Sequence, residues 1–577
     1  MKSATIRKEF YTRLSIFCLV IFLLTVPIPG FAQEPPGQEP GTQAERYKED
    51  VKRERQQLEH KERKRPEIKV EEEKPGFPAT GPSFILKEVK VTGSTVFKLQ
   101  DFQPIYQSHL NRKVAFQEMQ ELSGKIESKY KEKGYFTTTV YIPEQDIKNG
   151  VIEIRIAEGK MGRLDVEGSK WFSADFIKKF FHAKKNEILN VKTMARDILR
   201  LNKNPDLEVK ALISPGKDPQ TSDISLKVEG RQPWHTGFLQ DNRGSRLTGK
   251  YRSMVFIRSS NVSGLGDMLF FNSLYTGNSL GESISYSIPI GTYGTKFSLD
   301  ATYFKMKLGK EYKPFDITGN TQIYTPYFSW ELALSEVFEA YANLGMDIKS
   351  IKKKMAGDVT ANDQLRTPYF SFDFSKTDPT GQTTFSPKFN FGTAGFLGAS
   401  HRNHPTSSRA GTGGFFFKYE QSLNRMQKMF FNSYLSIRTR LQAASHTLAS
   451  SEQFQLGGAD SVRGYPEGDY LADSAAVANF DWVFPMYLIP KSWKLKGEEI
   501  PLRHQLEPVF FVDIGGGDLK KVLPGEKREK FLAGVGGGLR LRFKLFSLRL
   551  DWAKAIADKP ASGSGPSTFY FTFQSEL

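Results

Sequence analysis

The spacing of hydrophobic and polar residues divides most of the chain into two short stretches of mixed periodicity and one long stretch of alternation. In the first stretch a helix is predicted at 116–131, where apolar residues recur at the steps of one buried face: Phe116, Met119, Leu122, Ile126 and Tyr130. Further elements are predicted around it: a strand at 84–91, a helix at 99–108, and strands at 136–142 and 151–156. Together they indicate a small α/β domain over residues 81–159.

The second stretch repeats this order of elements at a period of about 75 residues. The predicted elements are a strand at 161–166, helices at 173–181 and 191–201, and strands at 207–213 and 224–228. They indicate a second small α/β domain over residues 160–230. Neither domain contains a cluster of candidate catalytic groups.

From about residue 231 to residue 577, apolar and polar residues alternate between turns rich in Gly, Asn, Asp and Ser. One predicted strand has a largely apolar face made of Phe431, Ser433, Leu435, Ile437, Thr439 and Leu441. Its other face is made of Asn432, Tyr434, Ser436, Arg438 and Arg440. About sixteen such segments have room for the ~10-residue tilted strands of a transmembrane antiparallel β-barrel, which we predict for this region. A soluble sandwich or propeller is the alternative, but no blade motif repeats.

The N-terminal segment, 1–32, has the pattern of a secretory signal peptide. Basic residues precede an apolar run at 14–26, and Gly30-Phe31-Ala32 offers a small-residue cleavage site. A transmembrane anchor is the alternative, but this run is shorter than the ~20 residues that span a bilayer. The single cysteine, Cys18, lies in this segment, so the mature chain is expected to contain no thiol.

A strongly charged segment at 33–80 follows. Its central part, about 44–74, has almost no apolar residues and so no hydrophobic core to join. Pairs such as Glu49 and Arg53 have the i,i+4 spacing that supports a solvated helix. A disordered linker is the alternative, because this composition cannot bury enough apolar surface to fold alone.

Overall composition is compatible with both a soluble and a barrel protein. The mean hydropathy is −0.44, but the strands of a membrane barrel also average to a polar value because lumen-facing residues alternate with lipid-facing ones. The net charge of +17 could indicate a nucleic-acid partner. Secretion removes the chain from nucleic acid, so we favour a charged lumen or a face toward anionic lipid.

Candidate catalytic chemistry is sparse. His401 and His404 are the one close histidine pair, and a metal site there would need further ligands. The triple glycines at 515–517 and 536–538 lack the strand-to-helix context of a phosphate loop, and they favour close backbone approach in a barrel. We therefore predict no catalytic residue, no metal and no cofactor, with a barrel-based enzyme as the less favoured alternative.

Two motifs in the alternating region resemble those of a known family. The first is Leu456-Gly457-Gly458-Ala459-Asp460-Ser461-Val462-Arg463-Gly464-Tyr465, in a long connection after the eleventh candidate strand. The second is Phe511-Val512-Asp513-Ile514-Gly515-Gly516-Gly517, on the thirteenth. Together with Tyr141-Ile142-Pro143-Glu144-Gln145 and Ser214-Pro215-Gly216 in the small domains, these motifs resemble the two-partner secretion transporters, the TpsB family of ShlB/FhaC/HecB-like haemolysin secretion/activation proteins.

The resemblance implies that the two small domains are POTRA domains and that a long loop, about 442–473, folds back into the lumen of a sixteen-stranded barrel. It also implies that Arg463, with Gly464 and Tyr465, anchors this loop by pairing with Asp513. The pairing is physically reasonable, because a guanidinium group can meet a carboxylate with two parallel hydrogen bonds. Alternation places Asp513 on the face opposite to its strand neighbours, as an inward carboxylate requires.

The family further implies a helix that plugs the pore, at the place of the charged segment. The expected cargo is an unfolded exoprotein of the haemolysin or adhesin type, which the POTRA domains within 81–230 would capture by strand addition in the periplasm. Outer-membrane lipid and the barrel-assembly machinery are further expected partners, and nucleic acid is not. The expected location is the bacterial outer membrane. An assembly factor that inserts other barrels is the alternative from the same superfamily, although the standard insertase has more POTRA domains.

Overall fold

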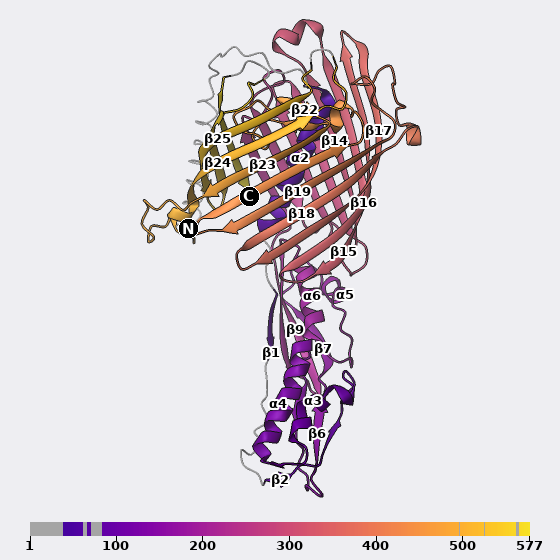
Figure 1. The fold of residues 1–577 in the computed structure, drawn as a ribbon, viewed down its shortest axis with the longest axis vertical. Helices are drawn as coiled ribbons and strands as arrows, with labels where there is room; N and C mark the ends of the chain where they lie inside the picture. Colours follow the sequence, from indigo (N-terminus) through magenta and orange to yellow (C-terminus); the bar gives the residue numbers. More distant parts are fainter. Residues whose placement is uncertain are drawn as a thin grey trace.

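The computed structural model describes residues 38–61, 66–70, 83–495, 497–523, 526–560 and 565–576. A closed β-barrel stands above a stem of two small domains (Figure 1). The predicted signal peptide, 1–32, lies outside the described residues. Among the helices described, none is both long enough and apolar enough to cross a membrane.

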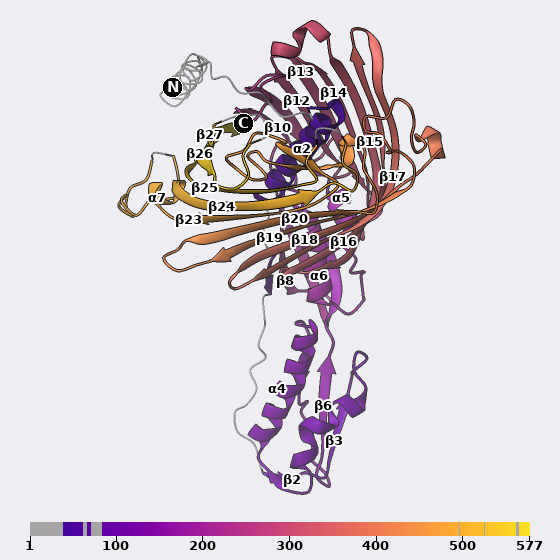
Figure 2. The same ribbon diagram turned by 45° about the horizontal axis from the view of Figure 1, so that its top comes forward.

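The first small domain, at the far end of the stem, has a sheet in the order β3-β6-β5 with the long helix α4 beside it (Figure 2). Its main elements are β2 (Phe84–Ile85), β3 (Glu88–Thr92), β4 (Lys113–Val114), α4 (Phe116–Lys133), β5 (Thr139–Tyr141) and β6 (Val151–Ala157). The predicted apolar face of α4 is buried at Met119, Leu122, Ile126 and Tyr130. Gly134 ends this helix with a φ of 100°, a conformation that glycine adopts without strain.

Two predicted elements of this domain are interrupted. In place of one helix at 99–108, the chain forms a 3₁₀ turn at Leu99–Asp101, the short helix α3 (Gln103–Tyr106) and a second 3₁₀ turn at Gln107–His109. The predicted strand at 84–91 is divided into β2 and β3. The division follows from a change of partner, because β2 pairs with β4 whereas β3 pairs with β6.

The second small domain has the same order of elements. These are β7 (Lys160–Glu167), α5 (Ala174–Lys179), α6 (Val191–Leu201), β8 (Leu207–Pro215) and β9 (Thr221–Gly230). The side chain of Asn190 accepts hydrogen bonds from two backbone N–H groups at the start of α6, which fixes where this helix begins. Met194, Ile198 and Leu201 of α6 are buried against the sheet.

A strand from the charged N-terminal segment completes the sheet of the second domain. β1 (Glu67–Val70) pairs in parallel with β8, so the sheet order is β1-β8-β9-β7. Ile68 and Val70 pack against the core of this domain. The expectation that the segment is only a helix or a disordered linker is therefore wrong for these residues, which form an edge strand.

Polar contacts fix the second domain against the barrel. Arg200 donates to Glu331 at 3.0 and 2.8 Å, and the carboxylate of Asp206 contacts the His235 ring nitrogen at 2.8 Å. The hydroxyl of Ser260 also donates to Asp206, at 2.6 Å. Since these partners lie on or beside barrel strands, the stem and the barrel share a defined interface.

The barrel contains sixteen antiparallel strands, as predicted, and closes by pairing of its first and last strands. The strands are β10 (Trp234–Asp241), β11 (Arg252–Ser259), β12 (Met268–Thr276), β13 (Ser279–Pro289), β14 (Lys296–Lys307), β15 (Thr318–Leu334), β16 (Phe338–Met355), β17 (Asp358–Asp378), β18 (Gly381–Gly392), β19 (Phe416–Lys428), β20 (Tyr434–Ala444), β23 (Ser474–Val483), β24 (Leu506–Asp518), β25 (Glu529–Arg542), β26 (Phe546–Ala555) and β27 (Ser567–Glu576).

Alternation along the barrel strands places apolar side chains outside and polar ones inside. In β24, Phe510, Val512 and Ile514 are exposed on the outer face, whereas Asp513 is fully buried. The strand predicted from Phe431 begins later than expected, at Tyr434. Phe431 and Asn432 have φ values of 56° and 52°, and this left-handed backbone forms a turn in place of an extended strand.

A buried carboxylate links the ends of the first small domain. Glu158 accepts hydrogen bonds from the backbone N–H groups of Thr95 and Val96 at 2.8 and 3.0 Å and from the Tyr130 hydroxyl at 2.7 Å. Burial alone would raise the pKa of Glu158, but these donors stabilise the anion and lower its pKa below the usual value.

We expect Glu158→Gln to weaken the first domain at neutral pH, with faster hydrogen exchange at 94–97 in the full-length chain. Because the pKa of Glu158 is lower in the folded state, its stabilisation is complete above the unfolded-state pKa and is lost as the pH falls through the folded-state pKa. The difference between variant and wild type should therefore shrink in acid. A difference that is constant with pH would contradict this account.

Candidate transport pore

The long connection between β20 and β23 folds into the barrel lumen. It spans residues 445–473, within the predicted 442–473, and contains a small hairpin of β21 (Phe454–Leu456) and β22 (Tyr470–Ala472). Val462, Arg463 and Tyr465 at its tip are fully buried. We call this connection the lumen loop.

Arg463 and Asp513 meet as a bidentate ion pair. The Nε and Nη2 atoms of Arg463 donate to the Asp513 carboxylate at 2.6 and 2.8 Å, and the Arg463 backbone N–H donates to it at 3.0 Å. The guanidinium carbon lies 3.5 Å from the centre of the Phe511 ring, a cation–π contact. Both side chains of the pair are fully buried, so bulk water solvates neither charge and each depends on its protein partners.

Two further aspartates surround Arg463. Its Nη2 atom donates to Asp481 on β23, and its Nη1 atom lies 3.6 Å from Asp551 on β26. Asn479 on β23 also donates to Asp513, at 2.7 Å. The motif comparison missed these groups, although the alternation of β23 and β26 could have placed both carboxylates on the inner face.

Gly464 and Tyr465 attach the loop tip to the next part of the wall. The Gly464 backbone N–H donates to the Tyr570 hydroxyl at 3.2 Å, and this hydroxyl donates to the Tyr465 carbonyl at 3.0 Å. Gly464 has a φ of 97°, and a Cβ atom there would lie 2.7 Å from the backbone nitrogen of Ala555. A larger residue at this position would therefore push the loop tip away from the wall.

The charged segment forms the helix α2 (Pro40–Lys61), which lies inside the barrel (Figures 1 and 2). Its buried apolar residues are Ala44, Tyr47, Val51 and Leu58, which pack against apolar side chains of the wall such as Phe256, Phe304 and Met306. The expectation that this segment has no core to join is therefore wrong. Its few apolar residues fall on one face of the helix, and the partner surface is the inner wall of the barrel.

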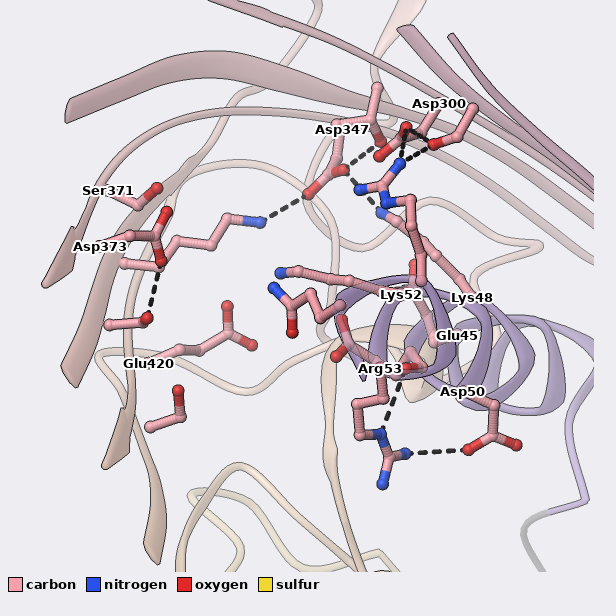
Figure 3. Close-up of a pocket in the computed structure, with 18 of the residues that line it drawn as sticks. Glu45, Lys48, Asp50, Lys52, Arg53, Asp300, Asp347, Ser371, Asp373 and Glu420 are labelled. Carbon is pink, nitrogen blue, oxygen red and sulfur yellow. Dashed lines mark hydrogen bonds and ion pairs between the residues drawn. The ribbon is translucent and has the colours of Figure 1, made fainter. Parts of the chain in front are cut away.

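The polar face of α2 is held by ion pairs with the wall. Lys48, which points toward Asp347 in Figure 3, lies 2.8 Å from its carboxylate. Arg55 lies 3.1 Å from Asp300. Three further pairs join Glu39 to Lys353, Glu45 to Lys349 and Asp50 to Arg252, each at 2.7 Å. The sequence predicted that Arg53 pairs with Glu49 on the helix. In the structure the Arg53 side chain donates to the backbone carbonyl of Glu49 and forms its ion pair on the helix with Asp50.

The helix and the lumen loop also hold each other. Arg53 pairs with Asp460 at 3.1 Å, and the Thr42 hydroxyl donates to the Ser450 carbonyl at 3.0 Å. Gln455 of the loop donates to the Thr42 carbonyl at 2.9 Å. The two segments therefore form one plug that crosses the lumen.

A polar cavity of about 560 Å³ remains beside the helix. Lys52 of α2 lines one side, and Ser371, Asp373 and Glu420 of the barrel line the other (Figure 3). The cavity is lined by many charged groups of both signs, which suits water and a polar chain better than an apolar ligand.

The described residues contain no group of three or more His, Cys, Asp or Glu side chains placed to hold a metal ion. The His404 ring nitrogen contacts the Thr406 hydroxyl at 3.1 Å in an exposed connection between β18 and β19. The triple glycines lie within β24 and β25, where their backbones pair with neighbouring strands.

Comparison with known families decides the family of the chain. The family described as haemolysin secretion/activation protein ShlB/FhaC/HecB matches residues 220–541. The chain belongs to this family. The POTRA domain of ShlB type matches residues 84–159, which is the first small domain. As in this TpsB family, the barrel lies in the outer membrane and the POTRA domains lie in the periplasm.

Relatives of this family are outer-membrane transporters. The outer membrane transporter CdiB of Dickeya dadantii is 23% identical over 409 residues, which cover 67% of this chain and 70% of that protein. The heme/hemopexin transporter protein HuxB of Haemophilus influenzae is 23% identical over 475 residues, covering 80% and 81%. The solved structure of CdiB from Escherichia coli has the same fold, with a TM-score of 0.74, 17% identity, and coverage of 93% of this chain and 99% of that one.

We expect Arg463→Ala to release the lumen loop without preventing barrel formation. The substitution leaves Asp513 buried without its cation, a loss of about 3–5 kcal/mol for a buried pair. The barrel should then unfold at a lower temperature, as measured by its heat-dependent mobility on gels. The exposed Arg402 supplies a control, and Arg402→Ala should behave as wild type. Equal unfolding temperatures for the two variants would contradict the anchoring role of Arg463.

Proposed function

We propose that this chain captures an unfolded exoprotein, of the haemolysin or adhesin type, in the periplasm and exports it through the barrel lumen. Membership of a family of secretion/activation proteins supports the transport role. The observation that carries the proposal is a polar lumen occupied by a helix that is linked to the periplasmic domains. No catalytic step is part of this function.

Cargo recognition would occur at a POTRA sheet edge. In the second domain, β1 already covers the edge strand β8. In the first domain, β5 is an outer strand of the sheet and lies beside α4. An extended cargo segment can pair with such an edge through backbone hydrogen bonds, which require little sequence specificity. We therefore favour the β5 edge of the first domain as the entry point.

Passage of the cargo requires the helix to leave the lumen. Glu39, just before α2, contacts Lys353 near the outer end of β16, and Glu54 of α2 contacts Gln574 near the periplasmic end of β27. The helix thus runs from the outer side toward the periplasm. Many of its contacts with the wall are ion pairs and hydrogen bonds, and water from the adjoining cavity can take over these polar groups as the helix withdraws toward the periplasm. Folding of the cargo outside the cell would then give the transport its direction.

A secretion assay tests the recognition step. Cells that express this chain and a large exoprotein partner are compared with cells in which Phe84–Val228 has been deleted from the chain. We expect only the intact chain to export the exoprotein. The intact chain and the deletion variant should be present at equal levels in the outer membrane. Export without the two domains would favour a simple channel, and assembly of other barrels without any export would favour the insertase alternative.

A disulfide between α2 and the lumen loop tests the passage step. A Cβ atom at Gly41 would lie 2.8 Å from the Cβ of Ser451, so cysteines at both sites need to move apart by only about 1 Å to reach disulfide geometry. We expect the variant with Gly41→Cys and Ser451→Cys to export nothing when oxidised and to recover when reduced. Each single variant serves as its control. Unchanged export by the oxidised double variant would contradict withdrawal of the helix.

A further inference from the structure

The connection between β23 and β24 is the longest one on the periplasmic rim of the barrel. β10 follows the periplasmic stem and runs away from it, so every second strand, including β23, ends on the periplasmic side. This connection contains the short helix α7 (Leu502–Gln505) and projects sideways from the barrel, away from the stem (Figure 2). We call it the rim loop.

The tip of the rim loop presents large apolar side chains to its surroundings. Leu488 is 92% exposed and Trp493 is 60% exposed. Tyr487, Leu495 and Ile500 are exposed as well. Apolar side chains gathered in this way on a protein surface mark a site of contact with another molecule or with lipid.

The rim loop is nevertheless well held. The Leu502 backbone N–H donates to the Trp493 carbonyl at 2.8 Å, and the Lys544 backbone N–H, in the next periplasmic turn, donates to Glu498 at 2.9 Å. The buried Arg503 side chain lies 4.9 Å from the centre of the Tyr487 ring. The exposed apolar residues are thus presented by a fixed scaffold.

The rim loop continues the aromatic belt of the outer barrel surface. The rings of Trp482 and Phe484 pack in a tilted arrangement with centroids 4.7 Å apart, Trp482 lies 5.6 Å from Phe430, and Phe484 lies 6.2 Å from Phe510. Phe510, on the outer face of β24, and Phe430, in the periplasmic turn between β19 and β20, are both more than half exposed. Aromatic belts of this kind mark the level of the lipid headgroups in outer-membrane barrels. The apolar tip therefore adjoins a surface that already faces lipid.

The charges on the rim loop also suit a lipid surface. Lys491 and Lys494 are exposed between Leu488 and Leu495. Of the two acidic residues, Glu498 is engaged by Lys544 and Gln505, and Glu499 is exposed. Lysine side chains that alternate with tryptophan, tyrosine and leucine are typical of segments that lie in the headgroup region.

We propose that the rim loop lies in the periplasmic leaflet of the outer membrane. Leu488 and Trp493 insert among the upper parts of the acyl chains, and Lys491 and Lys494 contact lipid phosphates. This contact fixes the depth of the barrel at β23 and β24, the strands that carry Asp481 and Asp513. The inference concerns the membrane and does not depend on the proposed cargo.

Site-directed spin labelling tests the inference on the full chain. Because Cys18 lies in the predicted signal peptide, a cysteine introduced by Leu488→Cys is the single labelling site of the mature protein. The labelled protein is placed in vesicles of phosphatidylethanolamine and phosphatidylglycerol. Collision of the label with oxygen is then compared with collision with a water-soluble nickel chelate.

Two further sites calibrate the measurement. Ile284→Cys on the outer face of β13, near the middle of the strand, reports lipid, and Leu99→Cys in the first small domain reports water. We expect the Leu488→Cys label to resemble that of Ile284→Cys, with severalfold more collisions with oxygen than with nickel. A label that resembles Leu99→Cys would overturn the proposal, as would an immobilised label that remains accessible to nickel, which would indicate a protein partner.

A charge-reversed variant tests the role of the lysines. With Lys491→Glu and Lys494→Glu added, the label at position 488 should become more accessible to nickel in vesicles that contain phosphatidylglycerol. Unchanged accessibility would overturn the assignment of these lysines to lipid phosphates. Lys554→Glu together with Lys559→Glu, at the extracellular end of β26 and in the connection that follows it, supplies a control with the same change in net charge.

Discussion

The buried charge of Arg463 is the constraint on which the architecture of the pore depends. A guanidinium group in a closed lumen requires carboxylate partners, and the inner wall supplies three of them from β23, β24 and β26. These contacts hold the tip of the lumen loop against one side of the barrel. The rest of the loop then crosses the lumen and forms the surface to which α2 is attached.

The plug and the periplasmic domains are parts of one continuous segment. α2 lies in the lumen, β1 follows it after a few residues, and β1 is an edge strand of the second small domain. This domain is in turn fixed to the rim of the barrel by Arg200 and Asp206. Displacement of the helix must therefore pull on a strand of the second small domain, at the base of the stem.

The alternation of apolar and polar residues along each strand was sufficient to predict the number of strands and the inward position of Asp513. It is readable in the sequence because each barrel strand has one side that faces lipid and one that faces the lumen. The apolar face of α2 escaped prediction, since Tyr47 and Val51 stand among charged residues and their partner is a surface formed by strands far along the chain. β1 escaped prediction for a similar reason, because its pairing with β8 is parallel and remote in sequence. Alternation could have placed Asp481 and Asp551 on the inner face, but their role as partners of Arg463 depends on the path of the lumen loop.

Photo-crosslinking of cargo in transit tests most directly that the lumen is the transport path. A photoreactive amino acid at Ser371 faces the cavity beside α2, whereas one at Phe370 on the same strand faces outward. During export, the account predicts adducts with the exoprotein at position 371 and none at position 370. Export without adducts at position 371, or with equal adducts at both positions, would contradict passage through the lumen.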